Sequence, residues 1–183
     1  DMQHQLKVFE NYLENEKHSS NNTITSYVRD VKQFAAYFNG RQIRGFNEVT
    51  PALVADYIKH LEECGKSVST ITRTVASLKC FFNLLVYRHD IVLNPMKSIV
   101  APKVKRKLPQ ILTGKEVDLL LSQPKGVDMK GYRDRAMLEI LYATGIRVTE
   151  LISLNLSDIN FGGSFIKCSS SGRERIIPLY PAA

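Results

Sequence analysis

The sequence has few of the residues from which metal sites and disulfide frameworks are built. Its 183 residues include only three cysteines, Cys64, Cys80 and Cys168, which are far apart and form no Cys-x-x-Cys pair. The four histidines show no metal-ligand spacing. We therefore expect no metal site and no cofactor, and thiols that stay buried or idle in a reducing cytoplasm.

Long apolar runs are also missing. No segment approaches the ~18 consecutive apolar residues of a membrane helix, and the first residues do not follow the basic, apolar, small order of a signal peptide. Internal repeats and low-complexity tracts are absent as well. Since 44% of the residues are apolar, the chain can bury a sizeable core. We expect a cytoplasmic protein without a membrane partner.

Positive charge is concentrated in the second half of the chain. Residues 1–96 hold 11 Lys/Arg and 10 Asp/Glu, a net charge of +1, whereas residues 97–183 hold 14 and 8, a net charge of +6. A basic segment of this kind fits a protein that contacts nucleic acid. Net charge alone fits ordinary solubility equally well.

Apolar stripes at helical spacing predict four helices in residues 3–95. The candidate start signals are Asn21-Asn22-Thr23, Thr50-Pro51 and either Ser67 or Ser69. The candidate ends are Asn39-Gly40 and Gly65. Short loops join these segments, so they predict a compact four-helix bundle. The aromatic residues recur every three to four positions, which favours a core over a base-stacking surface.

Polar residues of the fourth predicted helix are the better candidates for contact with DNA. They lie off its apolar stripe, and a lysine stands at its entrance: Lys66, Thr70, Thr72, Arg73, Ser77 and Lys79.

Residues 97–109 predict a basic linker. Its cations are Lys97, Lys103, Lys105, Arg106 and Lys107, with no acid among them. Pro102 and Pro109 favour an extended chain. Such a strap can lie along a phosphate backbone and release counterions, or it can be a solvated connection, and the composition does not decide between these.

The rest of the chain predicts helices and one hairpin. Thr113-Gly-Lys-Glu116 is a capping-box pattern, and residues 132–143 form a mostly apolar helix. Two strand-like runs, residues 164–168 and 175–179, are separated by a Ser169-Ser-Ser-Gly172 turn.

Arg147 lies between the last two helical patterns, just after a Thr-Gly turn. Glu150 follows three residues later, on the same helix surface. A helix start presents backbone N–H groups and a positive dipole end, and a guanidinium added there suits one phosphate. The residue types alone also fit a weak surface ion pair.

The order of residues from Ala143 to Ile159 resembles the first-arginine box of the tyrosine recombinases, the phage integrase and Xer family. The similarity extends to residues 22–30 with Phe34, to Ser69-Thr-Ile-Thr-Arg73 and to Asn94-Pro95. It implies a mainly α fold with three parts: a four-helix, SAM-like core-binding bundle in residues 1–96, a basic linker in 97–109, and the start of a mixed α/β, mostly helical catalytic domain with a small β-hairpin in 110–183.

The resemblance also implies roles for individual residues. Arg147 would grip the scissile phosphate and Glu150 would support it. The partners would be double-stranded DNA and other recombinase protomers. The complete recombinase would cut and rejoin DNA through a 3′-phosphotyrosine. The residues expected to contact DNA are Lys66, Thr70, Arg73, Lys79, Lys103, Lys105, Arg106, Lys107 and Arg173.

Two departures from the family pattern affect this interpretation. The family's hairpin lysine, a general acid, is replaced by Ser170, and Lys167 could substitute only if the hairpin shifted register. Neither a His-x-x-Arg motif nor the tyrosine nucleophile is recognisable in the 183 residues. We therefore expect a DNA-binding fragment of a recombinase, inactive by itself. The alternatives are a non-catalytic DNA-binding protein derived from a recombinase and a helical protein-interaction domain.

Overall fold

The computed structural model describes residues 2–38, 43–105, 108–170 and 173–179. They belong to two compact units, Asp1–Lys107 and Leu108–Ala183. The boundary between these units lies inside the predicted linker.

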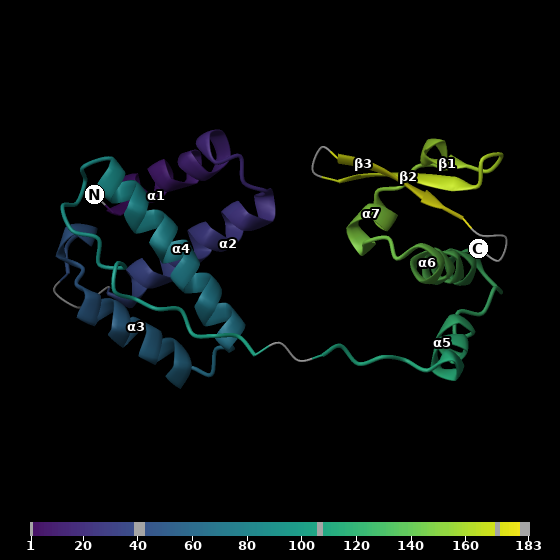
Figure 1. The fold of residues 1–183 in the computed structure, drawn as a ribbon, viewed down its shortest axis with the longest axis horizontal. Coiled ribbons are helices and arrows are strands. Elements are labelled where there is room, and N and C mark those ends of the chain that lie inside the picture. Colours follow the sequence, from purple (N-terminus) through teal and green to yellow (C-terminus); the bar gives the residue numbers. More distant parts are fainter. Residues whose placement is uncertain (1, 39–42, 106–107, 171–172, 180–183) are drawn as a thin grey trace. The chain divides into compact units, whose positions relative to one another are not determined.

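The first unit is a helical bundle, drawn from purple to teal in Figure 1. Its elements are α1 (Met2–Asn11), which continues into a π-helical turn at Tyr12–Glu16, α2 (Asn21–Tyr37), a 3-10 turn at Phe46–Glu48, α3 (Pro51–Glu63) and α4 (Val68–Tyr87). The predicted four-helix bundle is confirmed. The predicted helix end at Asn39-Gly40 lies outside the described residues.

Short polar side chains start three of these helices. The hydroxyl groups of Ser20, Thr50 and Ser67 each accept a hydrogen bond from a backbone N–H of the first turn. The prediction that Asn21-Asn22-Thr23 caps α2 is wrong. The cap is Ser20, whose hydroxyl accepts the N–H of Thr23, and the helix begins at Asn21. Of the two candidates for α4, Ser67 is the cap.

Interlocking aromatic rings form the core of the first unit. Phe34 packs edge-to-face against Tyr57 at 5.0 Å and Phe82 at 5.9 Å, and Phe81 does so against Phe9 at 5.2 Å, all between ring centroids. All five rings are at most 2% exposed. The predicted role of the aromatic stripes as core is confirmed, and each such pair adds about 0.5–1.5 kcal/mol beyond its area burial.

The chain that follows α4 packs back onto the bundle. Met96 is 1% exposed, and Ile99 and Ala101 pack against the same core. The hydroxyl of Thr72 donates a 2.9 Å hydrogen bond to the carbonyl of Pro102. The first half of the predicted linker therefore lies on the bundle, alongside α4.

In its described residues, the second unit combines three helices with a small sheet. Its elements are α5 (Gly114–Leu121), α6 (Met129–Thr144), α7 (Val148–Ile152), a 3-10 turn at Leu156–Asp158, β1 (Ile159–Asn160), β2 (Phe165–Ser170) and β3 (Arg173–Pro178). The strands form an antiparallel sheet in the order β1-β2-β3 (Figure 1). The predicted capping box at Thr113 and Glu116 starts α5.

The predicted hairpin is present, but its strands are longer than expected. Ser169 and Ser170 continue β2, opposite Glu174 and Arg173, so assigning them to the turn was wrong. Their backbone pairing extends the ladder, and residues 171–172 lie outside the described residues. The two-residue strand β1 was not predicted, because so short a strand has no detectable periodicity.

A small core brings α7 against the sheet. Its buried members are Ile146, Leu151, Ile166 and Cys168. This contact places the residues around Arg147 next to strands β2 and β3. Within the described ranges, no helix is long and apolar enough to span a membrane.

Candidate phosphate site and nucleic-acid interface

A tight turn between α6 and α7 positions Arg147. Gly145 ends α6 in the left-handed conformation, with φ of 62°, which favours glycine. The next residue, Ile146, is buried, and its N–H donates to the hydroxyl of Thr144 at 3.3 Å. Arg147 follows in an extended conformation and immediately precedes α7. Its backbone is thus fixed on both sides.

Glu150 is the centre of the site. Its side chain is 3% exposed. One oxygen, Oε2, accepts the backbone N–H of Arg147 at 2.9 Å, and the other, Oε1, accepts Nη1 of Arg147 at 3.1 Å. The predicted pairing of these two residues is therefore present, with a buried carboxylate in place of a solvated one.

A second guanidinium binds the same carboxylate. Nη2 of Arg175, in strand β3, donates to Oε2 of Glu150 at 2.5 Å. The backbone N–H of Arg147 does most to hold the pKa of Glu150 below its ordinary value of 4.5, burial acts in the opposite direction, and the Arg175 and Arg147 side chains lower it further. Glu150 is consequently a carboxylate at neutral pH.

The three side chains leave cationic groups exposed around a buried anion. The side chain of Arg147 is 65% exposed and that of Arg175 is 44% exposed. Two positive charges and one negative charge give these three side chains together a net charge of +1. A guanidinium anchored at one nitrogen can still donate from its other N–H groups to a phosphate oxygen.

The helix start contributes less to this site than we expected. Helix α7 has five residues, and the backbone N–H of Arg147 is already bonded to Glu150. Binding of an anion here would therefore depend on the guanidinium groups.

Sequence reasoning missed Arg175. A signal was present, because Arg175 is two residues from Ile177 in the same strand, and Ile177 packs against the small core. Residues two apart in a strand face the same side, so Arg175 points towards the helices. The sequence gives no indication that Glu150 would be its partner.

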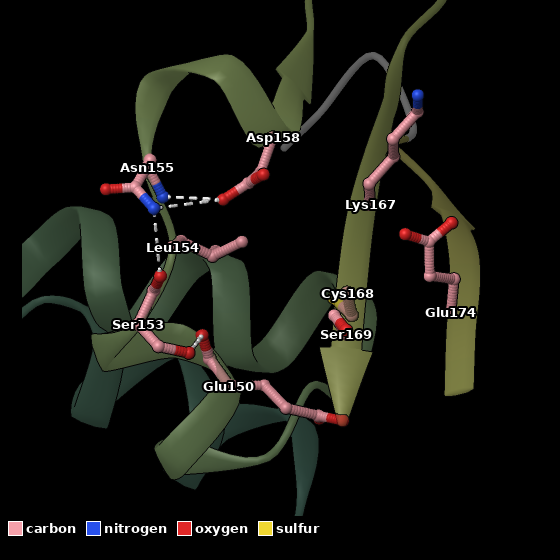
Figure 2. A pocket seen from close by; sticks show the side chains of 9 residues that line it. All are labelled: Glu150, Ser153, Leu154, Asn155, Asp158, Lys167, Cys168, Ser169 and Glu174. Carbon is pink, nitrogen blue, oxygen red and sulfur yellow. Dashed lines mark hydrogen bonds between the residues drawn. The ribbon is translucent and has the colours of Figure 1, made fainter. Parts of the chain in front are cut away.

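Lys167 lies on the other face of the hairpin. Its register partner is Ile176, and the adjacent pair is Cys168 with Arg175. Since successive side chains alternate, Lys167 points away from the face that carries Arg175. Figure 2 shows its amino group directed away from Glu150.

A pocket of about 290 Å³ lies between α7 and strand β2 (Figure 2). Its charged lining residues are Glu150, Asp158, Glu174 and Lys167. Three carboxylates against one ammonium make it unsuited to a phosphate. A phosphate would have to approach Arg147 from the solvent side instead.

The first unit holds a second buried carboxylate. Asp30, in α2, is 1% exposed and accepts from Nε of Arg73 at 3.1 Å and from Nη2 at 2.9 Å. The hydroxyl of Ser77 donates to the same carboxylate at 2.9 Å. The expectation that Ser77 belongs to the polar face of α4 was wrong, because Ser77 is completely buried where α4 packs against α2.

The other candidate DNA contacts differ in their surroundings. Lys66, Lys103 and Lys105 are exposed, and Lys79 is half-buried. The hydroxyl of Thr70 lies 2.9 Å from that of Ser67, within the cap of α4. Arg106, Lys107 and the side chain of Arg173 lie outside the described residues.

The cysteines and acids show no metal-site geometry in the part of the chain that the structure describes. No group of three or more His, Cys, Asp or Glu residues there could hold a metal ion. Cys64 is exposed, Cys80 is half-buried and Cys168 is buried.

Two family models match the two parts of the chain. Residues 6–89 match the phage integrase, N-terminal SAM-like domain, and residues 110–183 match the phage integrase family. Tyrosine recombinase XerD of Halalkalibacterium halodurans is 40% identical over 176 residues, which are 95% of the chain and 59% of that protein. Tyrosine recombinase XerC of Roseiflexus castenholzii is 38% identical over 184 residues, covering 100% of the chain and 59% of that protein. The chain thus spans less than two thirds of the length of these relatives.

Solved structures share the fold. A lambda integrase dimer bound to a COC′ core site superposes with a TM-score of 0.74 at 20% identity, covering 96% of this chain and 48% of that one. The Tn1549 transposon integrase in complex with circular intermediate DNA has a TM-score of 0.68 at 21% identity, covering 97% and 61%.

Proposed function

Because this chain belongs to the phage integrase family of tyrosine recombinases, we propose that it binds double-stranded DNA and supplies the first arginine of a strand-exchange site. The single observation that carries the proposal is the anchoring of the exposed Arg147 guanidinium by the buried carboxylate of Glu150.

The chemistry of Arg147 supports this role. When a nucleophile attacks a phosphodiester, negative charge builds on the non-bridging oxygens of the pentavalent phosphorus. A guanidinium held in place offers two parallel donors to those oxygens, at no cost of reorganisation. Removing one preorganised donor of this kind typically slows a reaction by about 10²–10³.

The complete reaction would need groups beyond those described. In the reaction that the family resemblance implies, a tyrosine attacks the phosphodiester, forms a 3′-phosphotyrosine and frees a 5′-hydroxyl, which later attacks a partner strand. It would take place between several protomers and would require neither a metal ion nor a nucleotide. In this scheme Arg147 holds the phosphate and Glu150 orients Arg147.

DNA contacts of the first unit would supply most of the affinity. The exposed cations Lys66, Lys103 and Lys105 are suited to phosphates. Arg73 still has N–H groups beyond the two that bind Asp30, so it can hold a phosphate or a base edge from a fixed position. We include Thr70, Lys79, Arg106, Lys107 and Arg173 in the proposed interface.

A non-catalytic DNA-binding protein is the second candidate. Ser170 takes the place of the family's lysine, and Lys167 points to the opposite face from Arg175. A protein of this kind would keep the DNA affinity and would lack the general acid.

Binding to fluorescent duplex DNA, followed by anisotropy at several salt concentrations, tests the shared part of both candidates. We expect the affinity to fall steeply and linearly in a plot of log K against log salt. A chain that binds no duplex even at low salt would contradict both and favour a protein-interaction domain.

A further inference from the structure

Among the residues that the structure describes, Arg175 contributes the one hydrogen bond to the Glu150 carboxylate that comes from outside residues 147–150. It lies in β3, whereas Glu150 and Arg147 lie at the start of α7. The bond joins residues 25 apart in the sequence. It therefore ties the position of the carboxylate to the sheet.

From this geometry we propose that Arg175 is a positioning residue, which fixes the carboxylate of Glu150 and through it the guanidinium of Arg147. The inference rests on the proposed role of Arg147 in holding a DNA phosphate. It adds a residue to that site for which the sequence had suggested no role.

The division of the carboxylate oxygens supports this inference. Oε2 of Glu150 takes the bonds from Arg175 and from the Arg147 backbone, which leaves Oε1 for Nη1 of the Arg147 side chain. A carboxylate held at one oxygen keeps its plane and directs the other oxygen to a fixed place. Without Arg175, the hydrogen bonds left to the Glu150 carboxylate within the described residues would both come from Arg147, the residue whose guanidinium Glu150 orients.

Charge gives a second reason. Glu150 with Arg147 alone would be a neutral pair and would attract a phosphate poorly. The positive charge of Arg175 balances the carboxylate and leaves the charge of Arg147 for the ligand.

The competing explanation is that the ion pair of Arg175 with Glu150 only fastens β3 to α7. Such an ion pair would stabilise the second unit without changing how well the Arg147 side chain is ordered. The two explanations therefore differ in the behaviour of the Arg147 side chain in the folded protein.

The test compares Arg175→Gln and Arg175→Lys with a matched control, Arg135→Gln. Arg135 is 61% exposed and has a loose 3.7 Å pair with Glu139 on α6, so its loss removes the same charge from the same unit. The first readout needs no DNA: it is the heteronuclear NOE of the ¹⁵Nε–¹H group of Arg147. We expect a wild-type value in the control, a clearly lower value in Arg175→Gln and an intermediate value in Arg175→Lys, which keeps the charge without the guanidinium plane.

The second readout is a double-mutant cycle on duplex DNA. If Arg175 acts through Arg147, Arg147→Gln should weaken binding in the wild-type background and have little further effect beside Arg175→Gln. For catalysis in a complete recombinase, we expect Arg175→Gln to cost roughly tenfold or more, as loss of an outer-shell partner does at metal sites.

Each result decides one question. A wild-type NOE for Arg147 in both Arg175 variants overturns the inference, and so does a wild-type value in Arg175→Lys if Arg175→Gln does not fold. Additive effects on DNA affinity would make Arg175 an independent contact and overturn it as well. If the NOE falls but Arg147→Gln leaves DNA affinity unchanged in the wild-type background, the positioning of Arg147 stands and the proposed function of the site fails.

Discussion

The carboxylate of Asp30 holds the guanidinium of Arg73 by two parallel hydrogen bonds, which join α2 to α4. Asp30 is 1% exposed, whereas the side chain of Arg73 is 37% exposed. This pair resembles the pairing of Glu150 with Arg147 in the second unit. In both, a buried acid holds an arginine whose other edge faces solvent.

Loss of Arg73 should destabilise the first unit. Arg73→Ala leaves the buried Asp30 charge with the Ser77 hydroxyl as its one side-chain partner among the described residues. We expect the free energy of unfolding to fall by about 3 kcal/mol, the lower end of what breaking a buried pair costs. Arg29→Ala, on the exposed side of α2, is the control and should change it by less than about 0.5 kcal/mol. Urea unfolding of both variants checks this, and equal stabilities would show that the pair contributes little.

Proteolysis should separate the two units at a defined place. Met96 is buried and Thr72 holds Pro102, so the chain up to Pro102 is protected by the bundle. Brief trypsin digestion should cut between Lys103 and Lys107 and leave a stable N-terminal piece, identified by mass spectrometry. First cleavage after Lys97 would mean that this packing is not maintained in solution.

Neutralising the basic strap, defined as Lys103, Lys105, Arg106 and Lys107, should weaken the salt dependence of DNA binding. Changing all four to Gln should reduce the slope of log K against log salt by about 0.9 for each DNA phosphate that the strap no longer neutralises. The matched control neutralises four lysines distant from the strap in sequence: Lys7, Lys59, Lys125 and Lys130. Equal slopes in the two variants would assign the strap a connecting role only.

Acid should remove the stabilisation that comes from Glu150. Its pKa in the folded chain is below the ordinary 4.5, so the unfolded chain takes up its proton first as the pH falls. The contribution is fully present above that ordinary value and is lost as the pH falls through the lower folded value. The difference in unfolding free energy between wild type and Glu150→Gln should therefore be constant at neutral pH and shrink in the acid range. A difference that does not change with pH would mean that the Glu150 pKa is not lowered.

Local patterns predicted the helices well, because their causes are local. The stripe through Phe34 and the caps at Thr50 and Thr113 depend on residues within a few positions of one another. Such patterns predicted the four-helix bundle and the start of α5 without knowledge of the tertiary structure.

Tertiary contacts could not be predicted in the same way. Asp30 lies beside an apolar stripe, and only the packing of α2 on α4 shows that its partner is Arg73, 43 residues away. Arg175 likewise meets Glu150 only after β3 pairs with β2 in one register. The family resemblance directed attention to Arg147 and Glu150, and the third member of their network required the structure.

The most direct test of the role proposed for Arg147 is covalent complex formation on a suicide DNA substrate, followed on a denaturing gel. The protein would join residues 1–183 to a C-terminal segment that carries the family's His-x-x-Arg motif and tyrosine, and residues 1–183 alone would serve as the blank, which should form no adduct. Lysine at position 147 keeps the charge and loses the two parallel donors. We predict that Arg147→Lys leaves DNA affinity nearly intact and slows adduct formation by about 10²–10³. Adduct formation by Arg147→Lys at the wild-type rate would contradict the role proposed here for Arg147.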